Sequence, residues 1–173
     1  MEIVKGPDND RVQTLTSMVE QYEVPLFRTC YMILRDRGLA EDAVQETFLK
    51  AYRALDTFRG ECSEKTWLMR IAVNACRDMQ RAQWLRFEDR RIQPELLPEP
   101  AQDYEGFNSL DLAQEVIRLP VRHREVVLLY FYHGMTMTET AAALGVSAAT
   151  VHKRLNQALA RLKHTLGRGY THG

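Results

Sequence analysis

The segment Met137–Val151, with the sequence MTETAAALGVSAATV, decides the fold of the C-terminal third of the chain. Gly145 stands where a tight turn between two helices favours a left-handed backbone, which glycine adopts without steric cost. Ala141 is small enough to let the two helices approach each other, and Val146 and Val151 fill the space between them. These positions predict a helix-turn-helix.

A longer helix is expected to follow the turn, from Ala148 to about Leu166. Its apolar positions fall on one face and leave polar and cationic side chains on the other, where a recognition helix reads base edges and neutralises phosphate. Ser147 can also cap the free amides at the start of this helix. The residues predicted to contact duplex DNA are Ser147, Ala149, Thr150, His152, Lys153, Arg154 and Asn156.

An ordinary helical hairpin with solvated charges is the alternative to DNA binding, because lysines and arginines are mostly exposed on any protein. The spacing from Ala141 to Gly145 and the absence of any acid after Glu139 favour DNA binding. For His152 alone, a DNA contact and a bystander role stay equally open.

Charge is unevenly distributed along the chain, although the formal net charge of its 173 residues is zero. Five basic residues and no acid lie between Ala148 and the C-terminus, whereas seven acids and two arginines lie in the range Glu88–Asp111. The basic end suits nucleic acid, and the acidic middle, which also holds three prolines, is typical of an extended linker.

Other classes of site leave no signal in the sequence. Cys30, Cys62 and Cys76 lack the pairing or spacing of a disulfide framework or a zinc site, so we expect buried, reduced thiols. No cluster of acids, activated nucleophile or glycine-rich phosphate loop is found, so no catalytic residues, no cofactor and no metal are expected. Without a transmembrane stretch or an apolar signal sequence, the protein is expected to be cytoplasmic, with no membrane contact of its own.

The low glycine and proline content and the helix-periodic apolar residues predict an all-α protein of two small helical domains joined by a flexible acidic linker. The expected division is a flexible leader at 1–10, a first domain at 11–86, the linker at 87–107 and a second domain at 108–168. In the first domain we expect two helices broken near Pro25, a stop at Gly38, and helices over Glu41–Leu55 and Ser63–Arg81. In the second, helices are expected over Leu110–Leu119, Arg122–Tyr132, Thr138–Leu144 and the recognition helix.

Several motifs resemble those of extracytoplasmic function (ECF) sigma factors, over roughly residues 15 to 166. In the second domain these are Leu119–Leu129, Gly134–Ala141 and Thr150–Leu155. In the first domain they are Ala40–Ala51, Phe58–Gly60 and Thr66–Asn74. The resemblance implies that the domains are sigma region 2, a helical bundle, and sigma region 4, a helix-turn-helix. Two motif sets in the family's order are much more specific than a lone helix-turn-helix.

The resemblance implies a role in transcription initiation for both domains. Region 4 would bind the duplex -35 promoter element, and region 2 would bind core RNA polymerase and assist melting at the -10 element. The residues off the apolar face of the Glu41–Leu55 helix form a strip that suits a partner helix bundle, although a solvated face is the alternative. The implied polymerase-binding residues are Glu41, Asp42, Gln45, Glu46, Leu49 and Lys50.

The loop and helix from Phe58 to Arg81 would hold the melted, single-stranded -10 element, because unstacked bases and their phosphates need cations and a pocket. Trp67 shares the spacing of the core and is expected to pack inside rather than to stack on a base. The residues implied for the melted strand are Phe58, Arg59, Lys65, Arg70, Asn74, Arg77 and Arg81.

Thr140 and His152 depart from the family's usual residues, which affects the promoter sequence expected rather than the class. The chain ends near Gly173 without room for an appended regulatory domain, so we expect control by a separate anti-sigma factor. A simple repressor or activator is the main alternative function, and the Ala40–Ala51 motif favours a sigma factor over it. A nuclease or recombinase would need the metal-binding acids or activated nucleophile that the sequence lacks.

Overall fold

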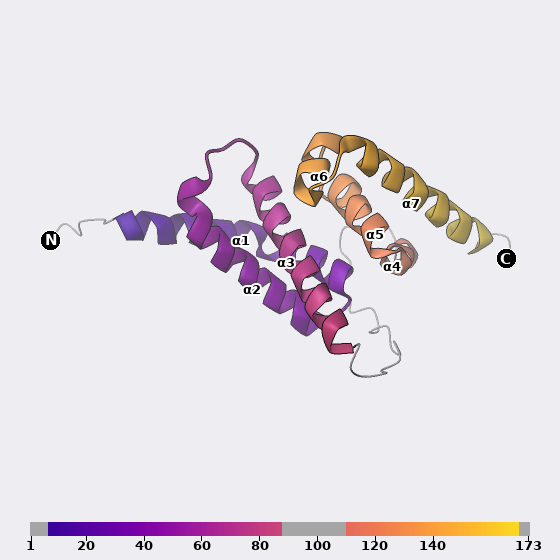
Figure 1. Ribbon diagram of the computed structural model, residues 1–173, viewed down its shortest axis with the longest axis horizontal. Helices are drawn as coiled ribbons and strands as arrows, with labels where there is room; N and C mark the ends of the chain where they lie inside the picture. Colours follow the sequence, from indigo (N-terminus) through magenta and orange to yellow (C-terminus); the bar gives the residue numbers. More distant parts are fainter. Residues whose placement is uncertain (1–6, 88–109, 170–173) are drawn as a thin grey trace.

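The computed structural model describes residues 7–87 and 110–169, and within these ranges it contains helices and no strands. Figure 1 shows two groups of helices, α1 to α3 and α4 to α7, with the start of α1 and the end of α7 on opposite sides of the molecule. The expected all-α architecture with two helical units is therefore confirmed. The linker expected at 87–107 lies outside the described residues, apart from Phe87 at the end of α3.

The first group is a bundle of three helices: α1 (Pro7–Leu34), α2 (Arg37–Ala54) and α3 (Glu64–Phe87), with a short 3-10 turn η1 (Leu55–Thr57) after α2. Each helix packs against the other two. Their buried faces are lined by Leu26, Val44, Phe48, Leu68 and Val73. The burial of these faces removes apolar surface from water and is the main stabilising contribution in such a bundle.

The break expected near Pro25 is wrong, because α1 continues through it as one helix. Met18, Leu26 and Cys30 are buried on the same face on both sides of the proline. Burial of this continuous face offsets the single backbone hydrogen bond that proline cannot donate. The helix also begins at Pro7, so residues 7–10, expected to be part of a flexible leader, are helical.

The stop expected at Gly38 is also misplaced. The chain turns at Arg35, which has a left-handed φ of 61°. Asp36 then caps α2 by accepting a hydrogen bond from the Leu39 amide at 2.8 Å. Gly38 lies within the first turn of α2, so the aspartate cap and not the glycine sets this boundary.

The second group contains α4 (Leu110–Arg118), α5 (Val121–Val127), a π-helical segment η2 (Leu128–Tyr132), α6 (Met137–Leu144) and α7 (Ala148–Gly169). Helix α7 packs against α4, α5 and α6. The buried core of this second group contains Val126, Leu129, Leu144, Val151 and Leu155. One cluster of buried apolar residues extends through both groups, and α6 lies against α3 (Figure 1).

Two of the three cysteines fit the expectation of buried thiols. Cys30 and Cys76 are buried and unoxidised, whereas Cys62 is exposed. A hydrogen bond with Cys30 and burial both raise the pKa of the Cys76 thiol, so this sulfur stays protonated and unreactive. Among the described residues, no group of histidine, cysteine and acidic side chains has the arrangement of a metal site. None of the described helices is long and apolar enough to cross a membrane.

Candidate nucleic-acid and polymerase interfaces

The helix-turn-helix has the local geometry that the sequence predicts. Gly145 has a φ of 64° and follows the end of α6, and the Val146 amide donates a hydrogen bond to the Ala141 carbonyl at 3.1 Å. At the other end of α6, Thr136 and Glu139 form a reciprocal capping box. Both ends of the helix before the turn are thus fixed by hydrogen bonds.

The start of α7 is held by Ser147, whose Oγ accepts a hydrogen bond from the Thr150 amide at 3.1 Å. The Thr150 hydroxyl lies 2.9 Å from the same Oγ and belongs to this cap. Val151 is fully buried behind it. Ser147 and Thr150, both predicted to contact DNA, therefore position the first turn of α7 in this structure.

The exposed face of α7 carries the rest of the predicted DNA-contacting set. Ala149, His152, Lys153 and Asn156 are exposed, and the Asn156 amide donates a hydrogen bond to His152 Nε2 at 3.2 Å. Arg154 is half-buried, and its Nη1 has no hydrogen-bond partner among the described residues. Polar and cationic side chains thus line one face of the N-terminal half of α7, which is where a recognition helix meets base edges.

Thr140 lies on the buried face of α6 and is fully buried, and its hydroxyl has no hydrogen-bond partner among the described residues. The sequence pointed to Thr140 as a place where promoter choice is set, and the structure places it away from the exposed face of α7. Its hydroxyl is a buried polar group without a hydrogen bond, which lowers the free energy of unfolding.

Replacing Thr140 with valine is expected to raise the free energy of unfolding by about 1 kcal/mol, because the swap keeps the shape and removes the unpaired hydroxyl. Chemical denaturation of the purified protein measures this change. A stability equal to or below that of the wild type would contradict it. Thr138→Val, at an exposed position of the same helix, is the control and should have little effect.

The predicted polymerase-binding residues share the solvent-facing side of α2. Glu41, Asp42, Gln45 and Leu49 are exposed, and Leu49 keeps 51% of its surface in solvent. Lys50 is half-exposed and lies 3.5 Å from Glu46 and 3.6 Å from Asp78 of α3. The strip is therefore polar with one exposed aliphatic, as predicted.

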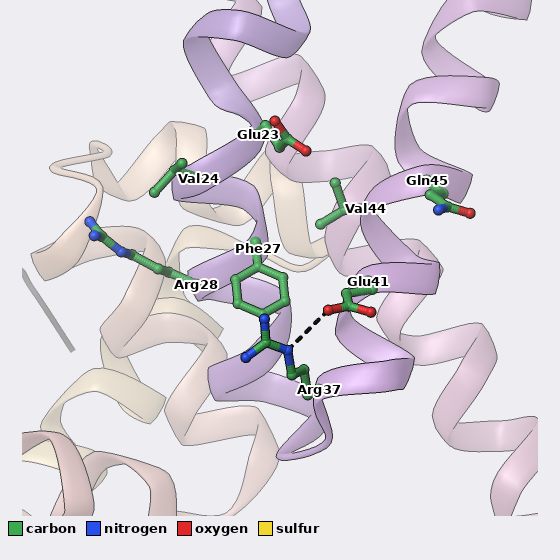
Figure 2. A pocket seen from close by; sticks show the side chains of 8 residues that line it. All are labelled: Glu23, Val24, Phe27, Arg28, Arg37, Glu41, Val44 and Gln45. Atoms are coloured by element: carbon green, nitrogen blue, oxygen red, sulfur yellow. Dashed lines mark hydrogen bonds and ion pairs between the residues drawn. The ribbon is translucent and has the colours of Figure 1, made fainter. Parts of the chain in front are cut away.

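A groove runs along each side of this α2 strip. Figure 2 shows the first, between α1 and α2, which is lined by the apolar side chains of Val24, Phe27 and Val44 and by the polar side chains of Glu23, Arg28, Arg37, Glu41 and Gln45. Its volume is about 450 Å³. Arg37 bridges the mouth of this groove: its Nε donates to Glu41 at 3.0 Å, and its guanidinium lies 5.9 Å from the Phe27 ring centre.

The second groove, of similar volume, lies between α2 and α3 and is lined by Leu49, Ala75, Met79 and Ala82 together with polar residues. Gln45 borders both grooves. Sequence reasoning found the α2 strip but missed the residues that α1 and α3 add to it. The one residue that could have indicated the contribution of α1 is Val24, an exposed apolar residue on the polar side of that helix.

An aromatic residue of the loop before α3 packs against an aromatic residue of α3 itself. Phe58 stacks on Trp67, with ring centres 4.6 Å apart, and both side chains are half-buried. Trp67 packs against the core, as the sequence predicted. Arg59, Arg70, Asn74 and Arg81 are exposed, although Arg81 pairs with Asp78 at 2.9 Å.

The two remaining strand-binding candidates, Lys65 and Arg77, contact the second half of the molecule. Lys65 Nζ donates to the His133 carbonyl at 3.2 Å, and Arg77 forms a salt bridge with Glu125 at 2.9 Å. The structure therefore does not bring all seven candidates together on one free surface. The sequence analysis did not predict these contacts between the two halves. The one feature that could have indicated them is the charged pair Arg124 and Glu125, which begins an apolar run and is therefore expected to be buried.

His133 lies buried at the contact between the two halves, where its Nε2 is hydrogen-bonded to the Thr29 hydroxyl of α1. Burial, with a smaller contribution from Lys65, lowers the pKa of His133 to about 3, from an ordinary value of 6.5. The folded protein therefore keeps this ring neutral, whereas the unfolded chain binds a proton below pH 6.5.

The contribution of neutral His133 to stability is complete above pH 6.5 and is lost as the pH falls from 6.5 towards 3. Between pH 7 and pH 5 we expect this group to lower the free energy of unfolding by about 2 kcal/mol. Denaturant titrations at both pH values measure the loss. His133→Gln, which stays neutral, should show a smaller loss, and an equal loss in both proteins would contradict the assignment.

Comparisons with known proteins match both halves. The sigma-70 region 2 family model matches residues 18–86, and the sigma-70 region 4 model matches residues 117–164. The RNA polymerase sigma factor NccH of Alcaligenes xylosoxydans xylosoxydans is 35% identical over 133 residues, which cover 70% of each chain. The ECF RNA polymerase sigma factor SigM of Mycobacterium tuberculosis is 32% identical over 144 residues, which cover 82% of this chain and 71% of that one.

Two solved structures share the fold. The sigma factor RpoE of Bartonella quintana, solved with the anti-sigma factor NepR, has a TM-score of 0.77 at 24% identity and covers 90% of this chain and 98% of its own. CnrH, solved with the cytosolic domain of CnrY, has a TM-score of 0.65 at 27% identity and covers 90% of this chain and 89% of its own.

A helical chain that matches both regions in order is a transcription-initiation factor of the sigma type, which acts with RNA polymerase in promoter-directed initiation. The chain belongs to the sigma-70 family, and within it to the ECF sigma factors.

Proposed function

We propose that this ECF sigma factor divides promoter recognition between its two halves. The second half reads the duplex -35 element with α7. The first half docks on core RNA polymerase through α2 and holds the melted -10 strand with the loop and helix from Phe58 to Arg81. The protein itself acts in the cytoplasm and carries out no catalysis, because the polymerase makes the RNA.

The single observation that carries the -35 assignment is the exposed face of α7. Its first three turns present Ala149, His152, Lys153 and Asn156, while Val151 and Leu155 anchor the opposite face in the core. Small Ala149 lets the helix approach the bases closely. Asn156 can pair with an adenine edge, and the hydrogen bond to His152 fixes the orientation of its amide. Lys153 and Arg154 supply charge for guanine or phosphate.

The polymerase assignment rests on the α2 strip and its two flanking grooves. An exposed leucine among polar side chains, with a groove of mixed polar and apolar lining on each side, suits a pair of partner helices better than open solvent. Gln45, which borders both grooves, lies at the centre of this surface. A separate anti-sigma factor that covers the same surface would silence the protein, and a related fold has been solved with such a factor bound.

Reconstituted transcription tests the proposal. Purified core RNA polymerase with this protein should initiate on a random-sequence promoter library, and the selected templates should share two sequence blocks at a fixed spacing. The main alternative, a simple operator-binding regulator, predicts tight binding to a palindromic duplex by the protein alone and no co-purification with core polymerase. That outcome would overturn the proposal.

A further inference from the structure

A hydrogen bond at the surface links the exposed face of α7 to the helix α5. His123 Nε2 lies 3.2 Å from Oε1, the side-chain oxygen of Gln157. The two helices also pack against each other in the core of the second group. Gln157 is exposed, and it is absent from the set of residues that the sequence predicts to contact DNA. The bond therefore brings a second helix to the edge of the proposed recognition face.

His123 is fixed in place because α5 is anchored around it. Its backbone amide donates to the Pro120 carbonyl at 2.9 Å, in the first turn of α5. Residues 124–127, which follow it, are buried. His123 itself is half-buried, and its Nδ1 is shielded from solvent and has no hydrogen-bond partner among the described residues. Nε2 is thus the ring nitrogen that serves a partner at the surface.

The direction of this hydrogen bond follows from the atoms involved. An amide oxygen only accepts, so the ring of His123 donates from Nε2 to Gln157 Oε1. The reverse orientation of the amide would make Nε2 the acceptor and place the ring proton on Nδ1, as a buried donor without an acceptor. The pairing therefore turns the oxygen of Gln157 towards α5. It leaves the two N–H donors of the amide unoccupied by His123.

Gln157 lies beside residues that the recognition face already contains. It follows Asn156 directly and comes one turn after Lys153, and side chains four residues apart are neighbours on a helix. A duplex that contacts Lys153 and Asn156 therefore comes within reach of Gln157. The donors of its amide suit an acceptor, either a phosphate oxygen or a base atom such as guanine O6. They do not suit adenine, which glutamine reads with its oxygen and its nitrogen together.

We propose that Gln157 is a further DNA-contacting residue of region 4, which donates its amide N–H to an acceptor on the -35 element, and that His123 is the positioning residue that holds the amide in this orientation. This inference rests on the proposed function, because it takes the exposed face of α7 as the side that meets DNA. The surface that contacts the -35 element then comprises α5 as well as α7. Gln157 rejects adenine only while His123 holds its oxygen.

Promoter binding by core polymerase that carries this protein tests the contact. Gln157→Ala should weaken binding to a promoter with the library-selected -35 element about tenfold, the loss typical of one specific DNA contact. Binding to a promoter with a scrambled -35 element should not change. Gln157→Glu still accepts from His123 but replaces the donors with a carboxylate, so it should lose at least as much. Equal binding by the wild type and Gln157→Ala would overturn the inference.

A double-mutant cycle tests the role of His123. His123→Leu removes the ring donor and should weaken binding about threefold, because the amide of Gln157 is then free to rotate. His123→Gln, which supplies an amide donor in place of the ring, should restore binding. In the Gln157→Ala background, His123→Leu should cause no further loss. A loss by the same factor in both backgrounds would overturn the positioning role. His164→Leu, the same change at an exposed position of α7, is the control and should leave binding unchanged.

The DNA distinguishes the two sources of the acceptor. If it belongs to a base, promoters that vary each -35 position in turn should reveal one position at which Gln157→Ala loses its preference and His123→Leu gains adenine. If it belongs to a phosphate, an uncharged methylphosphonate at one backbone position should weaken the wild type about tenfold and leave Gln157→Ala unaffected. Neither result at any position would overturn the inference.

The wild type provides the reference for the proposed function. If polymerase carrying it does not prefer the selected -35 element to a scrambled one, α7 does not read that element, and the contact at Gln157 fails with it. If the wild type does prefer the element while Gln157→Ala behaves in the same way, only the inference about Gln157 fails. The two failures are therefore distinguishable.

Discussion

Replacing both Lys153 and Arg154 with glutamate is expected to lower transcription from a -35-dependent promoter by at least about 100-fold, since each lost base or phosphate contact costs at least about 1 kcal/mol and reversal adds repulsion. Affinity for core polymerase should not change, because both residues lie on α7, away from the α2 strip. Run-off transcription and a core-binding assay on the same preparations measure the two quantities.

The control reverses two charges further along the same helix. Arg161 and Lys163 are exposed on α7 beyond its first three turns, so Arg161→Glu with Lys163→Glu makes the same change in net charge. We expect it to weaken promoter binding much less and to leave sequence preference intact. Retained promoter selectivity in the Lys153 and Arg154 variant, or equal losses in both variants, would contradict the assignment of the recognition face.

Replacing Gln45 and Leu49 with alanine is expected to weaken binding to core RNA polymerase by about 30-fold, the loss typical when central interface residues are truncated. Gln45 borders both grooves beside α2, and Leu49 exposes an apolar side chain that a partner would cover. Neither side chain is part of the buried core, so the fold should survive. Fluorescence anisotropy with labelled protein and unlabelled core polymerase measures the affinity.

A matched control comes from the first turns of α1. Val12 is 51% exposed, the same fraction as Leu49, and Gln13 beside it is exposed as well. Val12→Ala with Gln13→Ala therefore removes similar side chains at a similar exposure, away from both grooves. Polymerase affinity should stay at the wild-type level in this variant. If the two double variants lose affinity equally, α2 is not the docking surface.

The helix-turn-helix was predictable from sequence because its constraints are local. A left-handed backbone at Gly145, a cap at Ser147 and a buried Val151 each follow from steric or hydrogen-bonding requirements within a few residues. The polar strip on α2 was also predictable, since helix periodicity alone separates its exposed face from its buried face.

Features that depend on tertiary packing were less accessible. Local propensity predicts a break at Pro25, but the core buries both sides of it and keeps α1 continuous. In the sequence, Thr140 differs from the family's usual residue within a DNA-binding motif, whereas in the structure it is buried in the core. The sequence around Pro25 and Thr140 does not indicate which distant residues pack against them.

The contact between the halves was missed for the same reason. From the sequence, Arg77 is predicted to be an unpaired cation that contacts nucleic acid. Its partner Glu125 lies 48 positions away in the chain. A charged residue at the start of an apolar run indicates that it is buried with some partner, but not which one. Only the structure pairs these two residues.

Cross-linking within the polymerase-bound open complex tests the central claim most directly. A photoreactive amino acid is placed at His152 in α7 or at Asn74 in α3, both exposed, and the cross-linked nucleotides are mapped. The account predicts that position 152 reacts with duplex DNA at the -35 element and that position 74 reacts with the single strand at the -10 element. Cross-links from both positions to one element, or from neither to promoter DNA, would contradict it.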